Sequence, residues 1–230
     1  MNQTIKQKPI ERKLRGVADI VFCIDASGSM KPCLKGLKDH IEKFLDGLSS
    51  NKQITSLSWR LGIVAHDEKR FYILDFTSDL ARFKGALKKI KTGKNEFTLP
   101  ALDWSLDFPW NENAHKIVIA FTDEPLKDGY NPDFQASKKD QLFEKIKTLR
   151  CMVYFVGPEC PVYKEIQKLP RCFFVPIKEQ ADFFKVGFEQ VLERIGRTLS
   201  GSVASSAQTP KGKIEKDIYN IKEKIKVIKL

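Results

Sequence analysis

Long hydrophobic runs are absent from this sequence of 230 residues. No apolar stretch approaches the roughly 20 residues that a helix needs to cross a membrane. The N-terminal stretch MNQTIKQKPIERKLRG is polar and contains no apolar core of a secretory signal. We therefore expect no membrane span and a cytoplasmic location. The chain is still long enough for one α/β domain with a sizeable core, plus extensions.

Cysteine and histidine are scarce, with five and three residues. A structural zinc site usually contains a C-x2-C pair, and this pair does not occur here. The odd cysteine count, and the position of Cys23, Cys151 and Cys172 in or beside apolar runs, are typical of free buried thiols. Unpaired thiols suit a reducing compartment, which again favours the cytoplasm.

The motifs of several enzyme classes are also missing. The sequence contains neither G-x-x-x-x-G-K-[ST], nor G-x-G-x-x-G, nor G-x-S-x-G. The histidines His40, His66 and His115 are irregularly spaced and lie in no recognisable nucleophile or metal motif. Because no general base stands out, we expect that the protein is not an enzyme. Metal-assisted hydrolysis is the alternative that Asp25 and Asp123 leave open.

Acidic residues are too few to balance the lysines and arginines, so the net charge is +11. Residues 1–15 and 211–230 each carry a net charge of +4, which leaves only +3 for residues 16–210. A nucleic-acid-binding face on the central part of the chain is therefore poorly supported. Contacts of the two basic tails with RNA, DNA or acidic surfaces remain an alternative.

Apolar patterns of two kinds alternate along the chain. A near-continuous apolar run over residues 17–24 is typical of a strand buried on both faces. Similar strands are expected over 116–121, 151–156 and 172–175. Spacings of three and four predict helices over 34–48, 79–91, 99–106, 137–149, 162–169 and 179–199. Two further strands, over 58–66 and 69–77, are separated by Asp67 and Glu68 and predict an antiparallel hairpin.

This alternation of strands and helices predicts an α/β fold. We expect a doubly wound, mostly parallel sheet with one antiparallel edge strand and helices on both faces. Four parts are expected along the chain: a basic N-terminal extension (1–15), the α/β domain (16–199), a small, polar, flexible linker (200–210), and an amphipathic C-terminal helix rich in Lys and Ile (211–230).

The predicted C-terminal helix depends on five isoleucines that recur at spacings of four and three: Ile214, Ile218, Ile221, Ile225 and Ile228. Such a short helix is marginal alone in water, so we expect it to dock on its own domain, on a second copy or on a partner. Binding to a membrane surface is a further alternative, which the acidic residues of the segment weaken.

Oxygen-bearing side chains follow the ends of two predicted central strands. Asp25, Ser27 and Ser29 come directly after the first strand, and Asp123 follows the run over 116–121. The carboxyl ends of central parallel strands meet at one rim of a sheet, and the loop that carries Thr98 can close over them. Two carboxylates and three hydroxyls suit Mg²⁺, with Mn²⁺ or Ca²⁺ as alternatives, and leave coordination positions open. The milder alternative is a loop in which Ser29 caps the next helix.

These residues resemble the metal-ion-dependent adhesion site of the von Willebrand factor A domain family. The segment DASGSM resembles the DxSxS signature, Thr98 begins a segment like the threonine segment of the family, and Asp123 ends a strand like its aspartate strand. The resemblance covers about residues 16–199 and implies a metal site made of Asp25, Ser27, Ser29, Thr98 and Asp123. Glu96 and Glu124 depart from the pattern, because many members have glycine there.

The resemblance implies an interaction module rather than a catalyst. An acidic side chain of a partner protein would complete the coordination of the cation. The chain is similar to short bacterial stand-alone members, including the TerY-like group, that work beside kinases, phosphatases or ATPases in stress and defence systems. An adaptor of an AAA+ ATPase and a nucleic-acid-associated subunit that acts through its basic tails are the alternatives.

Overall fold

The structure is a computed structural model that describes residues 14–48, 54–177, 192–193, 196–197, 216–222 and 224–230. Seven strands form one sheet in the order β6-β5-β4-β1-β2-β3-β7. The strands are β1 (Leu14–Asp25), β2 (Ile54–His66), β3 (Arg70–Thr77), β4 (His115–Phe121), β5 (Met152–Pro158), β6 (Cys172–Ile177) and β7 (Lys226–Lys229). The helices are α1 (Lys31–Leu48), α2 (Leu80–Lys89), α3 (Thr98–Leu106), α4 (Pro132–Ser137), α5 (Lys139–Leu149) and α6 (Pro161–Ile166).

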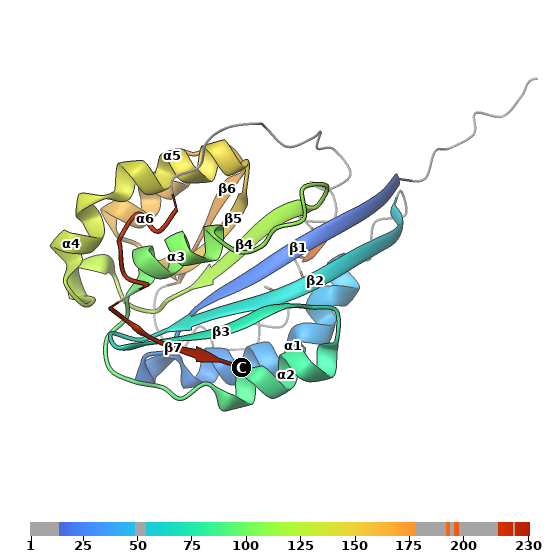
Figure 1. The fold of residues 1–230 in the computed structure, drawn as a ribbon, viewed down its shortest axis with the longest axis horizontal. Coiled ribbons are helices and arrows are strands. Elements are labelled where there is room, and N and C mark those ends of the chain that lie inside the picture. Colours follow the sequence, from blue (N-terminus) through green and yellow to red (C-terminus); the bar gives the residue numbers. More distant parts are fainter. Residues whose placement is uncertain (1–13, 49–53, 178–191, 194–195, 198–215, 223) are drawn as a thin grey trace, which may run out of the picture.

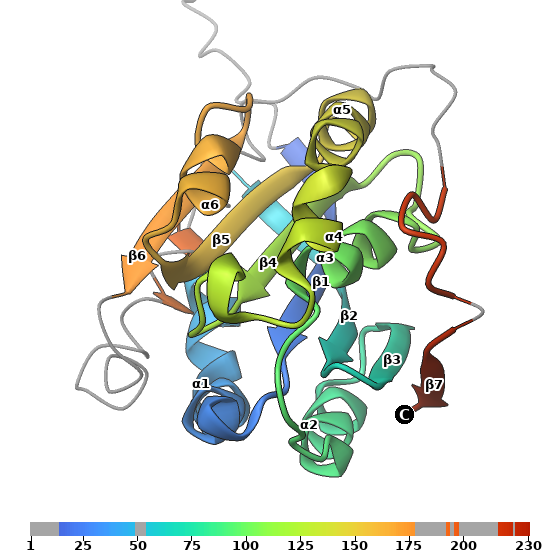
Figure 2. The ribbon, with the colours of Figure 1, turned by 90° about the vertical axis from the view of Figure 1, so that its left-hand side faces the viewer.

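Helices cover both faces of the sheet. In Figure 2 the strands follow one another from β6 on the left to β7 on the right, with α1 and α2 below them and α3 to α6 above. β1 explains why two layers form: Ile20, Phe22 and Ile24 pack into the core with α1 and α2, while Val21 and Cys23 pack into the other core. The continuous apolar run of β1 therefore serves both faces of the sheet, as a central strand requires.

The fold class predicted from the sequence is confirmed. β1 pairs in parallel with β2 and β4, and the order continues in parallel through β5 to β6. The antiparallel pair is β2 with β3, as the hairpin pattern predicts. However, β3 does not form the edge of the sheet, because β7 pairs with it in parallel through Arg70–Lys226 to Ile73–Lys229.

The predicted C-terminal helix over 211–230 is wrong for residues 216–222 and 224–230, which form turns and then strand β7. Asp217 and Asn220 have positive φ angles of 49° and 54°, which a right-handed helix does not allow. The described isoleucines are buried or partly buried without forming a helix. Ile218 and Ile221 are buried in the same core cluster as residues of α3 and α5, whereas Ile228 packs against the core on the other face of the sheet.

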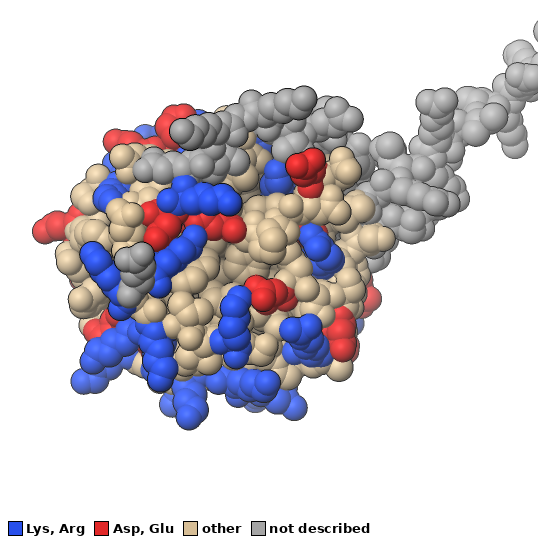
Figure 3. All heavy atoms as spheres, viewed as in Figure 1, with Lys and Arg blue, Asp and Glu red and all other residues tan. Residues whose placement is uncertain are grey.

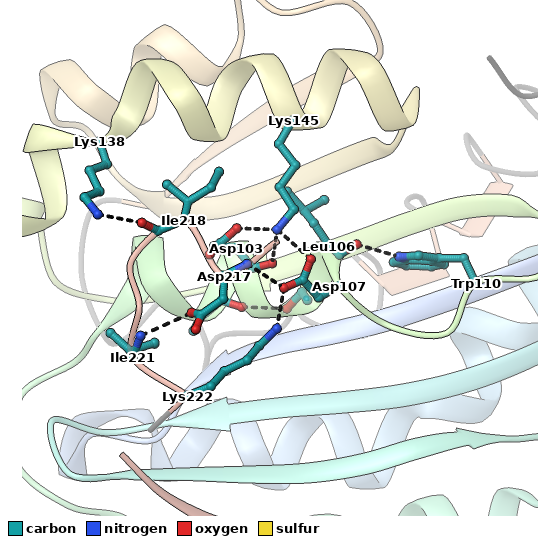
Figure 4. Close-up of polar contacts among 12 residues, drawn as sticks. Asp103, Leu106, Asp107, Trp110, Lys138, Lys145, Asp217, Ile218, Ile221 and Lys222 are labelled. Carbon is teal, nitrogen blue, oxygen red and sulfur yellow. Dashed lines mark hydrogen bonds and ion pairs between the residues drawn. The ribbon is translucent and has the colours of Figure 1, made fainter. Parts of the chain in front are cut away.

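The C-terminal segment docks on its own domain through polar contacts that surround α3 (Figure 4). The Asp217 amide donates to Asp107 Oδ2 at 2.9 Å, and the Lys222 ammonium pairs with the same carboxylate. Lys138 Nζ donates to the Ile218 carbonyl at 2.6 Å. Of the three predicted docking places, the described C-terminal residues therefore occupy the chain's own domain.

Several predictions fall on residues that the structure does not describe. The linker over 200–210, most of the N-terminal extension over 1–15 and most of the helix over 179–199 lie outside the described residues. None of the helices in the described part of the chain is both long enough and apolar enough to cross a membrane.

Candidate functional site

The candidate site lies where β1 and β4 end side by side. The two strands are paired in register up to Ile24 and Phe121, so the residues that follow them leave the sheet at the same rim (Figure 1). Asp25 is the last residue of β1, and Asp123 comes two residues after the end of β4. The topology therefore brings together two carboxylates that are 98 positions apart in the sequence.

A chain of hydrogen bonds links four of the five predicted residues. The Ser27 amide donates to Asp25 Oδ1 at 2.6 Å, and the hydroxyl oxygens of Ser27 and Ser29 lie 2.9 Å apart. Ser29 Oγ then donates to Asp123 Oδ1 at 3.1 Å. The other Asp25 oxygen, Oδ2, accepts a hydrogen bond from Thr122 Oγ1 at 3.1 Å. The D-x-S-x-S segment and the second aspartate thus form one cluster of oxygen atoms.

The backbone of the first loop is held from a neighbouring segment. The Ala26 amide donates to the His66 carbonyl at 2.7 Å, and the Gly93 amide donates to the Ala26 carbonyl at 2.8 Å. A β-carbon on Gly93 would lie 2.2 Å from Asp67 Oδ2, so only glycine fits this close approach. A 3-10 turn over Gly28–Met30, with Met30 buried, then leads into α1. These contacts fix the position of the two serine hydroxyls.

Thr98 is the first residue of α3 and is 1% exposed. Both of its neighbours are anchored: the Phe97 amide donates to His66 Nδ1 and the Leu99 amide donates to Gln135 Oε1, each at 3.1 Å. Thr98 makes no direct hydrogen bond with the other four residues among the contacts that the structure describes. Its segment nevertheless lies beside them, because the Phe97 amide and the Ala26 amide of the first loop both donate hydrogen bonds to His66, the former to the ring and the latter to the carbonyl.

Both carboxylate oxygens of Glu96 are buried without a hydrogen-bond partner among the described residues, and so are two oxygen atoms of the predicted metal ligands. These two ligand atoms are Thr98 Oγ1 and Asp123 Oδ2, which belong to the two segments predicted to complete the site. Buried polar atoms without a partner are costly, so natural structures keep few of them. A bound cation would give both ligand atoms a partner.

The electrostatics of the rim also favour a positive ligand. Burial raises the pKa of Asp25 to about 7, and the charge of Asp123 adds to the effect. Burial and the charge of Glu124 raise the pKa of Asp123 in turn. For Glu96 the same causes, burial first and then Asp25 and Glu124, raise the pKa to about 9. The described contacts of these three carboxyl groups include no cationic side chain, and a bound cation would lower their pKa values.

The donor set fits a hard divalent cation. Asp25, Asp123 and the hydroxyls of the site offer only oxygen atoms, which Mg²⁺, Mn²⁺ and Ca²⁺ prefer. In the described part of the chain, no group of three or more His, Cys, Asp or Glu side chains is placed to hold a metal ion. A cation at this rim would therefore depend on the serine and threonine hydroxyls as much as on the carboxylates.

Sequence reasoning missed some of the residues that support the site. Thr122 orients Asp25, yet it stands at the end of an apolar run where a lone threonine carries little signal. Tyr163, on α6, donates through its hydroxyl to the Glu124 carbonyl at 3.3 Å, and nothing in the sequence links these two residues. His66 is the end of a strand, as expected, but its ring also accepts the Phe97 amide.

A family model for the von Willebrand factor type A domain matches residues 20–125, a range that contains all five predicted site residues. A comparison with curated protein sequences finds no match. Among solved structures, a von Willebrand factor type A protein from Catenulispora acidiphila is 16% identical with a TM-score of 0.56. That match covers 81% of this chain but only 43% of the other, so the chain spans less than half of its length.

Two further structures have similar folds. The von Willebrand factor domain of the type V pili tip protein Mfa5 from Porphyromonas gingivalis is 12% identical, with a TM-score of 0.56. The match covers 88% of this chain and 99% of the Mfa5 domain. A proximal thread matrix protein from the mussel byssus, solved with zinc in its metal-ion-dependent adhesion site, is 17% identical with a TM-score of 0.53. The match covers 79% of this chain and 46% of the byssus protein. At these identities the likeness to solved structures shows the fold alone, and the similarity to the von Willebrand factor type A domain family model extends over residues 20–125.

Proposed function

We propose that this protein is a metal-dependent interaction module. Asp25, Ser27, Ser29, Thr98 and Asp123 would hold a divalent cation, Mg²⁺ in the first place and Mn²⁺ or Ca²⁺ as alternatives. An acidic side chain of a partner protein would complete the coordination. The observation that carries the proposal is the pair of buried, unpartnered oxygen atoms, Thr98 Oγ1 and Asp123 Oδ2, beside a hydrogen-bonded cluster of oxygen ligands.

Each part of the chain has a defined task in this proposal. When bound, the cation supplies an electrophilic centre for a carboxylate oxygen of the partner. The serine hydroxyls offer oxygen without adding negative charge, which leaves attraction for an incoming carboxylate. Thr122 fixes the orientation of Asp25, and supporting hydrogen bonds of this kind tune metal sites. The Gly93 and Ala26 backbone holds the loop in place before the ion binds.

We further propose the cellular setting that the resemblance to short bacterial members implies. The protein would act in the cytoplasm as a subunit or regulator of a bacterial stress or defence system with a kinase, phosphatase or ATPase, as in the TerY-like group. It would bind rather than catalyse. An adaptor of an AAA+ ATPase is the second candidate. A nucleic-acid-associated role through the basic tails is the third, and the charge of residues 1–15 and 211–230 is what favours it.

Metal binding and partner binding are tested in two steps. Titration with Mn²⁺ should show one site in the wild-type protein and none in the double variant Asp25→Ala with Ser27→Ala. A matched control combines Ser137→Ala and Asp140→Ala, two exposed positions on α4 and α5, and should bind Mn²⁺ like the wild type. Capture of partners from the native host is then compared in Mg²⁺ and in EDTA. Identical partners under both conditions would refute the metal-bridged mechanism.

A further inference from the structure

A lysine-lined groove runs between α1 and α2. It has a volume of about 510 Å³ and is lined by Lys31, Leu34, Lys35, Lys38, Leu87, Lys88, Ile90, Lys91 and Thr92. Five of these nine residues are lysines and none is acidic. Figure 3 shows basic side chains gathered along the lower edge of the molecule, below the sheet, where α1 and α2 lie in the same view of Figure 1. The floor between the lysines is apolar.

The positive charge of this groove is poorly balanced by the protein itself. Lys31, Lys35 and Lys38 are spaced by four and three residues, so they share one face of α1. The N-terminal end of α1, which begins at Lys31, adds the positive end of its helix dipole, and its first turn has no acidic residue. In the described part of the chain, only Lys38 among the five has an acidic partner, Asp39 at 3.9 Å. An anionic ligand would relieve this repulsion.

The groove begins at the rim that carries the candidate metal site. Thr92 lines the groove, and its neighbour Gly93 bonds to the Ala26 carbonyl in the D-x-S-x-S loop. At the other wall, Lys31 follows Ser29 by two residues. A segment that leaves the metal site therefore meets the lysines at once. From Lys31 to Lys38 the helix rises about 10 Å, which an extended peptide spans with roughly three residues.

We propose that this groove binds an acidic segment of the same partner protein whose carboxylate completes the metal site. The inference rests on the proposed function and names its partner class: a segment in which further carboxylates and apolar side chains follow the metal-bound acidic residue. The lysines pair with the carboxylates, while Leu34, Leu87 and Ile90 contact the apolar side chains. A nucleic acid would satisfy the lysines, but it carries no carboxylate to complete the metal site at which the groove begins, so the peptide is the favoured occupant.

Binding of two labelled probes of similar charge tests the proposal. One is a ten-residue peptide of alternating aspartate pairs and leucines, and the other is a single-stranded oligonucleotide with a matching number of phosphates. The groove variant combines Lys35→Glu and Lys88→Glu, and the control combines Lys147→Glu and Lys168→Glu, which changes the same charge at exposed positions elsewhere. In Mg²⁺ the groove variant should bind the peptide at least tenfold more weakly than the wild type. The control should differ by less than twofold.

The outcomes separate this inference from the proposed function. If EDTA weakens binding of the peptide but both lysine variants bind it equally well, the groove is not the peptide site, and the proposed metal-dependent function is still supported. If the groove variant binds weakly but EDTA has no effect on the wild type, the metal-bridged mechanism fails, and so does the continuous site proposed here. No binding of the peptide to the wild type, or tighter binding of the oligonucleotide that survives EDTA, would also overturn it. Unchanged thermal unfolding of both variants confirms that they are folded.

Discussion

Replacement of Lys145 by methionine should be among the most destabilising single changes in this protein. The Lys145 side chain is 1% exposed and its ammonium lies 2.5 Å from Asp103 Oδ1 and 2.7 Å from Asp107 Oδ1 (Figure 4). Both carboxylates are almost fully buried as well, at 1% and 5% exposure of their side chains. Methionine keeps the length of the side chain but removes the charge. Asp103 would then be left as a buried carboxylate without a cation.

The expected loss is about 3–5 kcal/mol of unfolding free energy, since this is the usual cost of removing one partner from a buried ion pair. Asp107 retains Lys222 and the Asp217 amide, so most of the cost falls on Asp103. Urea unfolding followed by tryptophan fluorescence measures the change, and Trp104, 5.5 Å below Lys222 Nζ, reports on this region. The double variant Lys145→Met with Asp103→Leu should recover more than half of the loss.

Lys147→Met is the matched control, because Lys147 lies two positions further on the same helix but is exposed and pairs with Glu144 at the surface. Its loss should stay below about 1 kcal/mol. If Lys145→Met cost no more than this control, the carboxylates of Asp103 and Asp107 could not be ionised and buried as described. If the double variant were less stable than Lys145→Met, uncompensated charge on Asp103 would not be the cause of the loss.

Three further predictions follow from the same contacts. Gly93→Ala should weaken Mn²⁺ binding and lower the melting temperature, because the added carbon meets Asp67 at 2.2 Å; equal Mn²⁺ titrations would contradict this. Thr122→Val should weaken Mn²⁺ binding by about 10- to 100-fold, since it removes the donor to Asp25 at nearly constant shape, and unchanged affinity in calorimetry would refute that role. Burial raises the pKa of Asp107, but the hydrogen bonds from Lys145 and Lys222 outweigh this effect and hold the pKa below the ordinary value of an aspartate. The ionised carboxylate therefore stabilises the fold above its unfolded pKa, and this stabilisation is lost as the pH falls through the folded pKa. The unfolding free energy of Asp107→Asn should therefore depend less steeply on pH than that of the wild type between about pH 5 and pH 2, and equal slopes in urea titrations at several pH values would contradict this.

The central part of the fold could be predicted because its signals are local. Strands such as β1 and β4 are continuous apolar runs, and α1 has a strongly periodic apolar face. Each of these elements can therefore be recognised from its own residues. The alternation of elements then restricts the topology, because parallel strands require crossover connections. The mostly parallel sheet with helices on both faces and the antiparallel hairpin follow from these few rules, whereas the addition of β7 at the edge does not.

The candidate site was predictable for a different reason. Its five residues lie at the ends of elements whose positions the topology fixes, so the sequence alone indicates that Asp25 and Asp123 meet. The supporting residues were not predictable, since Thr122 and Tyr163 act through contacts that join distant segments. A hydroxyl at the end of a strand has no distinctive neighbours in the sequence. Only the three-dimensional arrangement shows that it holds a carboxylate.

The C-terminal segment shows where periodicity misleads. Isoleucines at spacings of three and four predict a helix when the segment is considered alone. Two positions with positive φ, Asp217 and Asn220, instead turn the chain so that Ile218 and Ile221 enter one core and Ile228 reaches the other. Asparagine and aspartate tolerate this conformation better than most residues. The unpaired edge of β3, a long-range feature, then accepts β7 as a strand.

This segment is also linked to the candidate metal site through α3. Thr98 begins α3, while Asp103 lies within it and Asp107 directly follows it; both carboxylates pair with Lys145. Asp107 in turn binds the C-terminal segment through Lys222. A short helix of nine residues has little stability of its own, so its position depends on these contacts at its far end. The threonine hydroxyl at the rim is therefore positioned in part by residues near the end of the chain, although no signal in the sequence connects them.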